Sequence, residues 1–132
     1  MKTRFGRSVL LVEDYDEAFD FYHKNFFCEK IFDETLTDGQ RYLHIRFSDD
    51  SDTGIWFLKA GSESQEKLIG KQTGGQPALV IYTNDCSKLY QHVKNNQVEI
   101  IDPIKFTKGS IFFHCEDLYG NRITVVELTS SL

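Results

Sequence analysis

Two histidines and two glutamates are the side chains of this chain that could bind a metal or move a proton. His44 and His114 lie on predicted strands, and Glu116 and Glu127 lie near predicted strand ends. Histidine and carboxylate ligands together hold many divalent ions, but these four show no close pairing such as HxH or HxxxE. The spacing therefore gives little support to a metal site. Either histidine could still act as a general base in a metal-independent reaction.

Strand alternation gives these histidines aromatic and cationic neighbours. In the run YLHIRF (residues 42–47), the three apolar side chains should pack under a helix and the three others should point to the opposite face. Aromatic walls with arginine suit a planar, anionic or polar small molecule. Alternatively, the rings fill space between two sheets and the arginines pair with carboxylates at a dimer interface. The candidate ligand-binding residues are Arg7, Tyr42, His44, Arg46, Trp56, Tyr82, Phe112, His114 and Thr124.

The three cysteines give no sign of a metal or redox motif. Cys28, Cys86 and Cys115 are widely spaced, with no CxxC pair, and each lies in a predicted helix or strand among apolar neighbours. We expect buried, reduced thiols.

Composition excludes several classes of protein. The 132 residues, 40% of them hydrophobic, suffice for one compact domain with a packed core. The net charge is −5 and no basic stripe is present, so a nucleic-acid partner is not expected. No apolar run approaches the ~18 residues of a membrane span, and the N-terminus lacks the apolar core of a signal peptide. We expect a cytoplasmic protein with no membrane partner.

An internal repeat organises the chain. A shift of 71 residues places Val9 on Val80 and Asp14 on Asp85, so that each short β-rich run ends in an acidic residue. An amphipathic helix follows each run, with apolar residues at i, i+3, i+4 and i+7. Asp14 and Asp85 are the predicted N-caps of these helices.

Three strand-like segments follow each predicted helix. The fold class is therefore α+β, with two tandem βαβββ modules whose sheets each carry the helix on one face. We place module one at about residues 1–60, a linker at 61–77 and module two at about 78–132, within one domain of residues 1–132. The predicted strands are 29–36, 40–48 and 54–60 in the first module, and 98–104, 110–116 and 121–128 in the second.

Three stretches resemble the vicinal oxygen chelate superfamily, which includes glyoxalases, bleomycin-resistance proteins and extradiol dioxygenases. They are VLLVEDYDEAFDFYHKNFF, ALVIYTNDCSKLYQHV and EDLYGNRITVVE. The family's last turn usually has Pro and Asp where this chain has Leu118 and Tyr119. Phe27 replaces the glycine that commonly ends the first helix, so this helix should lose its left-handed stop, with Asn25 serving instead.

The resemblance also locates the positions that bind the ion in metal-dependent relatives. They fall at Arg7, Trp56, Ala78 and Thr124, the Trp56 assignment being uncertain by one or two residues. Arginine keeps its proton, alanine and tryptophan offer no lone pair, and a lone threonine hydroxyl is a weak ligand. We therefore expect no metal and no cofactor.

The resemblance and the residues together predict a metal-free protein, similar to bleomycin-resistance proteins and homodimeric, that binds a small aromatic or anionic ligand on the concave sheet face. One alternative is a glyoxalase-like lyase or isomerase, or a dioxygenase, with a displaced metal site. A second alternative is a protein-interaction module whose concave face is closed by a partner chain.

Overall fold

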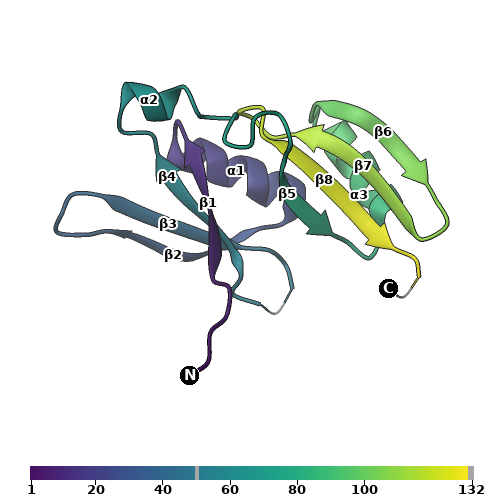
Figure 1. The fold of residues 1–132 in the computed structure, drawn as a ribbon, viewed down its shortest axis with the longest axis horizontal. Coiled ribbons are helices and arrows are strands. Elements are labelled where there is room, and N and C mark those ends of the chain that lie inside the picture. The colour runs from purple at the N-terminus through teal and green to yellow at the C-terminus, as the bar shows by residue number, and fades with distance from the viewer. Residues whose placement is uncertain (50, 131–132) are drawn as a thin grey trace. The chain divides into compact units, whose positions relative to one another are not determined.

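The computed structural model describes residues 1–49 and 51–130. The chain divides into two compact units, Met1–Ile69 and Gly70–Leu132, each with a four-stranded sheet and a covering helix (Figure 1). The first unit contains β1 (Arg7–Val12), α1 (Tyr15–Phe26), β2 (Glu29–Thr35), β3 (Arg41–Arg46), β4 (Gly54–Lys59) and the short α2 (Glu63–Glu66). The second unit contains β5 (Pro77–Tyr82), α3 (Cys86–Asn95), β6 (Ile100–Phe106), β7 (Ser110–Glu116) and β8 (Arg122–Leu128).

The two sheets share one topology. Their strand orders are β1-β4-β3-β2 and β5-β8-β7-β6. In each sheet the first strand of the module runs parallel to its last strand, and the remaining pairs are antiparallel. This repetition confirms the predicted α+β fold of two tandem βαβββ modules.

One face of each sheet is buried against its helix. In the first unit Leu43, Ile45 and Phe57 are fully buried, and the Phe57 ring lies 5.6 Å from that of Tyr22 on α1. Burying a side chain of this size contributes ~2 kcal/mol. The predicted alternation is thus correct along β3, whereas Phe47, beyond the strand end, is only half-buried.

The second unit buries the equivalent face. Phe113 and Cys115 on β7 and Val125 on β8 are fully buried, and the Phe113 ring contacts Tyr90 on α3 at 5.0 Å. Because alternate residues of a strand point to opposite faces, the remaining side chains of both sheets are held on the face that the helix does not cover.

Both predicted N-caps are confirmed. The Asp14 carboxylate accepts the Glu17 backbone N–H at 2.9 Å, and Asp85 accepts that of Lys88 at 3.0 Å. At α3 the Glu127 carboxylate also accepts the Cys86 N–H at 2.8 Å, which ties the end of β8 to the start of the helix.

The predicted loss of the left-handed stop after α1 is wrong. Phe27 itself adopts the left-handed conformation, with φ 61° and ψ 27°, and its N–H donates to the His23 carbonyl. Asn25 does not replace it, because Asn25 is buried and its side chain donates to the Phe21 carbonyl. Backbone bonding at the helix end outweighs the steric cost of a left-handed phenylalanine.

The turn before β8 is organised by one buried carboxylate. Asp117 accepts the backbone N–H groups of Tyr119 and Asn121 and the Asn121 side-chain amide, at 2.8–2.9 Å. Gly120 has φ 92°, a conformation that glycine adopts without strain. Leu118 and Tyr119 therefore replace the family's usual residues without loss of the turn.

All three cysteines are free and buried, as the sequence predicts. Burial raises the pKa of Cys28 and of Cys115 to about 12 and that of Cys86 to about 11. The thiols therefore stay protonated and unreactive at neutral pH.

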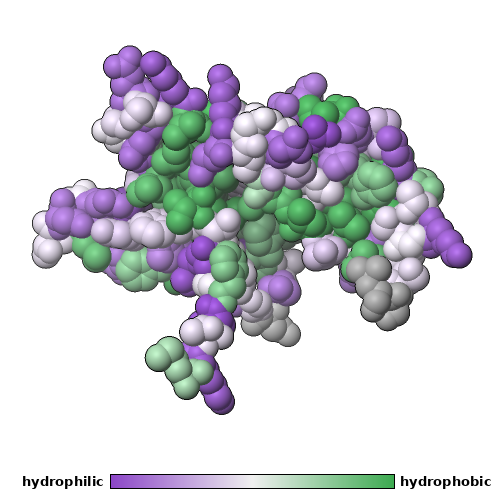
Figure 2. Space-filling model, in the orientation of Figure 1, coloured by the Kyte–Doolittle hydropathy of each residue, from purple (hydrophilic) through white to green (hydrophobic). Residues whose placement is uncertain are grey.

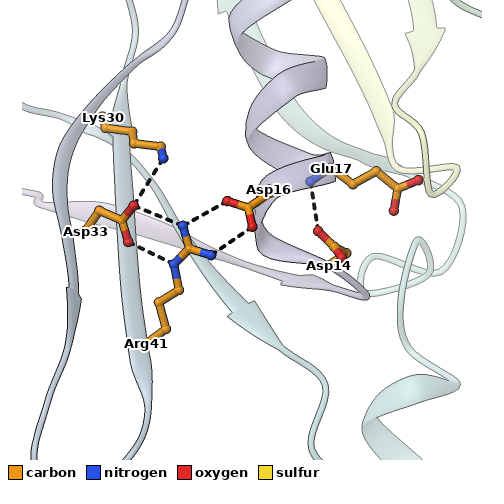
Figure 3. A network of polar contacts seen from close by, with 6 residues as sticks. All are labelled: Asp14, Asp16, Glu17, Lys30, Asp33 and Arg41. Carbon is orange, nitrogen blue, oxygen red and sulfur yellow. Dashed lines mark hydrogen bonds and ion pairs between the residues drawn. The ribbon is translucent and has the colours of Figure 1, made fainter.

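An ion-pair network fastens β3 to α1 (Figure 3). Arg41 donates to both carboxylate oxygens of Asp33 on β2 and to both of Asp16 on α1, at 2.8–3.1 Å, and Lys30 adds a contact to Asp33 at 3.1 Å. The pKa of Asp33 falls to about 2, chiefly through its hydrogen bond with Arg41.

Hydrophobic side chains also reach the surface among the polar ones (Figure 2). Val80, Tyr82 and Phe106 are more than half exposed. In the part of the chain that the structure describes, no helix is long and apolar enough to cross a membrane.

Candidate functional site

The candidate residues fall into two groups, one on each sheet. Tyr42, His44 and Arg46 lie on β3, Arg7 on β1 and Trp56 on β4. All five are half-buried, whereas their alternating neighbours on β3 and β4 are fully buried. They therefore occupy the face opposite α1, as predicted.

Backbone pairing sets four side chains in a row across the first sheet, and two of them, His44 and Trp56, are candidates. Val9 pairs with Trp56, Trp56 with His44, and His44 with Phe32. The His44 ring lies 5.5 Å from that of Trp56 and 5.5 Å from that of Phe32. Tyr42 stacks on Trp56 at 6.0 Å with an interplanar angle of 26°. We call Tyr42, His44, Trp56 and Phe32 the first-sheet ring cluster.

Phe32 was not among the sequence candidates. Strand alternation alone did not identify it, because the β2–β3 register shifts between Lys30 and Phe32. The antiparallel pairing with His44 is what places Phe32 on this face.

The two candidate arginines of the first sheet, Arg7 and Arg46, differ in their partners. Arg46 forms an ion pair with Glu29 on the adjacent strand at 3.2 Å. Arg7 has an Nε atom that is shielded from water and has no hydrogen-bond partner among residues 1–49 and 51–130. A carboxylate of the same chain thus neutralises Arg46, whereas no ion pair of Arg7 is found within the described residues.

Two further buried polar atoms of the same face lack partners within the described ranges. They are Nε2 of His44 and Nε1 of Trp56. Burial, and secondarily the positive charge of Arg7, lower the pKa of His44. The imidazole is therefore neutral near pH 7.

The second sheet carries a corresponding row with different chemistry. Val80 pairs with Thr124, Thr124 with His114, and His114 with Asp102. His114 Nδ1 lies 2.8 Å from the Thr124 hydroxyl, and the Phe112 ring lies 5.8 Å from that of His114. Burial, and then the nearby Arg122, lower the pKa of His114.

Asp102 and Arg122 were not identified from the sequence either. Arg122 donates to Asp102 at 2.7 Å, which places an ion pair beside His114. Asp102 lies on β6, whose register with β7 shifts on both sides of it, so alternation did not predict which face it occupies.

The two rows establish which residues correspond between the modules. The pairing of Val9 with Trp56 matches that of Val80 with Thr124, and both Trp56 and Thr124 pair with the central histidine of their sheet. Trp56 is therefore the structural counterpart of Thr124, which resolves the uncertain alignment of its strand.

The last candidates lie on β5. Tyr82 is 67% exposed, so in this structure it is a surface ring rather than part of a packed cluster. Ala78 falls at the register shift of β5 between Pro77 and Leu79, and Val80 rather than Ala78 pairs with Thr124.

The side chains at the four metal positions do not fit a divalent ion. Trp56 and Ala78 offer no ligand atom, Arg7 carries a positive charge, and the Thr124 hydroxyl is hydrogen-bonded to His114. Among the described residues, no three His, Cys, Asp or Glu side chains lie close enough together to hold an ion elsewhere.

The family model of the Glyoxalase/Bleomycin resistance protein/Dioxygenase superfamily matches residues 4–125. The chain belongs to this superfamily. A protein of Shewanella frigidimarina (strain NCIMB 400), described as an uncharacterized protein, is 26% identical over 129 residues, which cover 97% of this chain and 96% of that protein.

Solved structures share the fold. The chain resembles UcmS2 with a TM-score of 0.82 at 20% identity, covering 96% of this chain and 98% of the other. It resembles TnmS3, an antibiotic binding protein from Streptomyces sp. CB03234, with a TM-score of 0.77 at 19% identity, covering 97% and 98%. At these identities the likeness establishes the architecture and leaves the ligand to be argued from the residues.

Proposed function

We propose that this protein binds a small aromatic or anionic molecule without a metal, on the sheet face opposite the helix. The observation that carries the proposal is the first-sheet ring cluster, with Arg7 on the same face. The partly accessible rings supply stacking area, and a guanidinium supplies directed hydrogen bonds to oxygen. The likeness to TnmS3, an antibiotic binding protein, supports a binding role.

Absence of a metal is part of the proposal. It is supported by the residue types at positions 7, 56, 78 and 124, which cannot together form the set of three or four ligands that a divalent ion requires. Elemental analysis of natively purified protein tests this directly. Zinc, nickel, iron or manganese near one per chain would refute it.

Ligand binding is tested by a thermal-shift screen of aromatic acids and aromatic antibiotics. A ligand at 100 times its Kd adds ~2.7 kcal/mol of stability, which corresponds to a rise of roughly 10 °C in Tm for a domain of this size. If no compound of a broad aromatic panel raises Tm or perturbs the Trp56 fluorescence, the proposal fails.

A metal-independent enzyme is the second candidate, and the lowered pKa values of His44 and His114 favour it. A neutral imidazole near pH 7 can accept a proton, as a general base must. Mass spectrometry of a ligand recovered after long incubation separates the two functions. Unchanged ligand identifies a binding protein, and a product whose formation requires His44 or His114 identifies an enzyme.

We also propose that the protein is a cytoplasmic homodimer. The three free, buried cysteines are consistent with a reducing compartment, and exposed apolar side chains such as Val80 and Tyr82 are available for self-association. Light scattering coupled to size-exclusion chromatography should give twice the chain mass. A monomer at micromolar concentration would refute the dimer.

A further inference from the structure

The unpaired polar atoms are unevenly distributed between the two modules. Arg7 Nε, His44 Nε2 and Trp56 Nε1 all belong to the open face of the first sheet. The other such atom in residues 1–49 and 51–130 is Nε of Arg122 on the second sheet, but Arg122 already donates through Nη2 to Asp102. A buried donor without an acceptor costs stability until one is supplied.

The chemistry of the unpaired atoms on the first sheet specifies what they lack. Arginine and tryptophan nitrogens are donors only, so Arg7 and Trp56 require an acceptor oxygen. The positive charge of Arg7 makes an anionic oxygen the strongest acceptor. Both side chains are half-buried and lie on the open face of the sheet, outside the closed core beneath it.

The corresponding positions of the second sheet satisfy one another. His114 bonds Thr124, and Arg122 bonds Asp102. Asp102 occupies the position that corresponds to Phe32, because each pairs with the central histidine of its sheet. Asp102 is already paired with Arg122, whereas Phe32 adds apolar surface beside His44.

We infer that the first module holds a carboxylate-binding subsite for an aromatic acid. The Arg7 and Trp56 N–H groups donate to the carboxylate, and Tyr42, stacked on Trp56, supplies the surface for the adjoining ring. This inference rests on the proposed binding function and adds the ligand class and the module that binds the carboxylate.

The test uses the single tryptophan of the chain. Because Trp56 is the sole indole, its Nε1–H gives one resonance in a ¹⁵N–¹H correlation spectrum of the full-length protein. The probes are 2-naphthoate and 2-naphthylmethylammonium, which share a ring system and differ in the charge of the attached group. We expect 2-naphthoate to bind at least about tenfold more tightly and to move the indole resonance downfield, as a charge-assisted hydrogen bond does.

Matched arginine variants assign the subsite to one module. Arg7→Gln should weaken 2-naphthoate binding about tenfold and abolish the preference over the ammonium probe. Arg122→Gln, the control on the second sheet, should leave the preference within about twofold of the wild type. Trp56→Phe keeps an aromatic ring and removes the indole N–H. For every variant, the backbone amide resonances of the same spectrum report whether the protein is folded.

Several results would overturn the carboxylate subsite, and they differ in whether the proposed function survives. Equal binding of the two probes, tighter binding of uncharged aromatics than of 2-naphthoate, or loss of the preference in Arg122→Gln would each overturn the carboxylate subsite while the proposed function stands. If self-association is lost in Arg7→Gln and 2-naphthoate binding is intact, the acceptor belongs to a second copy and the inference is wrong. If no aromatic compound binds, the proposed function falls as well.

Discussion

Replacing Arg41 with glutamine should destabilise the protein at neutral pH and have a smaller effect in acid. Arg41 bridges Asp33 and Asp16, two carboxylates from different elements, with four hydrogen bonds of 2.8–3.1 Å. Arg41→Gln removes the charge and the fork while keeping most of the side-chain volume. The loss falls on the contact between β3 and α1 rather than on the buried core.

The magnitude follows from the Asp33 carboxyl, whose pKa is lowered from 3.8 to about 2 in the folded state. A folded-state pKa below the unfolded one stabilises the protein above the unfolded pKa, and this stabilisation is lost as the pH falls through the folded pKa. The shift corresponds to at most about 2 kcal/mol. Because the side chains of Arg41 and Asp33 are 27% and 28% exposed, solvent screening reduces the expected value to about 1 kcal/mol.

The assay is urea unfolding of wild type and Arg41→Gln at pH 7 and pH 3. At pH 7 the variant should be about 1 kcal/mol less stable, and at pH 3 this difference should shrink to about half. Lys67→Gln is the control, because Lys67 and Glu63 are 4.0 Å apart and both side chains are exposed. This substitution should change the free energy of unfolding by no more than ~0.5 kcal/mol. If Arg41→Gln lowers the free energy of unfolding equally at pH 7 and pH 3, the stabilisation does not come from the lowered pKa of Asp33. If the variant is as stable as the wild type at pH 7, the ion pairs of Arg41 do not stabilise the protein.

Three further predictions concern the turn, the helix end and the metal. Asp117→Ala should lower the free energy of unfolding by roughly 2–4 kcal/mol, because buried N–H groups of Tyr119 and Asn121 lose their acceptor; an unchanged urea midpoint would contradict this. Phe27→Asn should stabilise the protein by about 0.5 kcal/mol, since asparagine tolerates the left-handed conformation and the lost ring is already 52% exposed. If Phe27→Asn instead lowers the free energy of unfolding by more than ~1 kcal/mol in the same assay, packing of the Phe27 ring stabilises the protein. Dialysis against EDTA should change Tm by less than about 1 °C and leave ligand binding intact, and a larger fall in Tm would reveal a structural ion.

The duplicated fold could be predicted because each element carries a local signal. Asp14 and Asp85 cap helices whose apolar stripes repeat, and the β3 alternation correctly assigned Leu43 and Ile45 to the core. Phe27 was mispredicted because residue type argues against a left-handed phenylalanine. The backbone hydrogen bonds at the C-terminal end of α1 decide the conformation of Phe27. These bonds depend on the path of the chain from α1 into β2.

The site could be predicted only where strands are regular. Tyr42, His44 and Trp56 were assigned to the open face because alternation along β3 and β4 is unbroken. Phe32 and Asp102 were missed because register shifts on β2 and β6 interrupt alternation near both. Whether an arginine is paired also depends on contacts between strands, and for this reason Arg7 and Arg46 could not be distinguished from the sequence.

The duplication allows one strand arrangement to present different polar groups on the open faces of its two sheets. Each sheet retains a histidine at its centre, His44 or His114, while the residue paired with it on the last strand is Trp56 in one module and Thr124 in the other. Threonine satisfies its histidine within the protein, and tryptophan leaves a donor without an acceptor. Because both rows follow the same strand order, the side chain paired with the histidine contributes to the difference between a closed polar pair and an open donor.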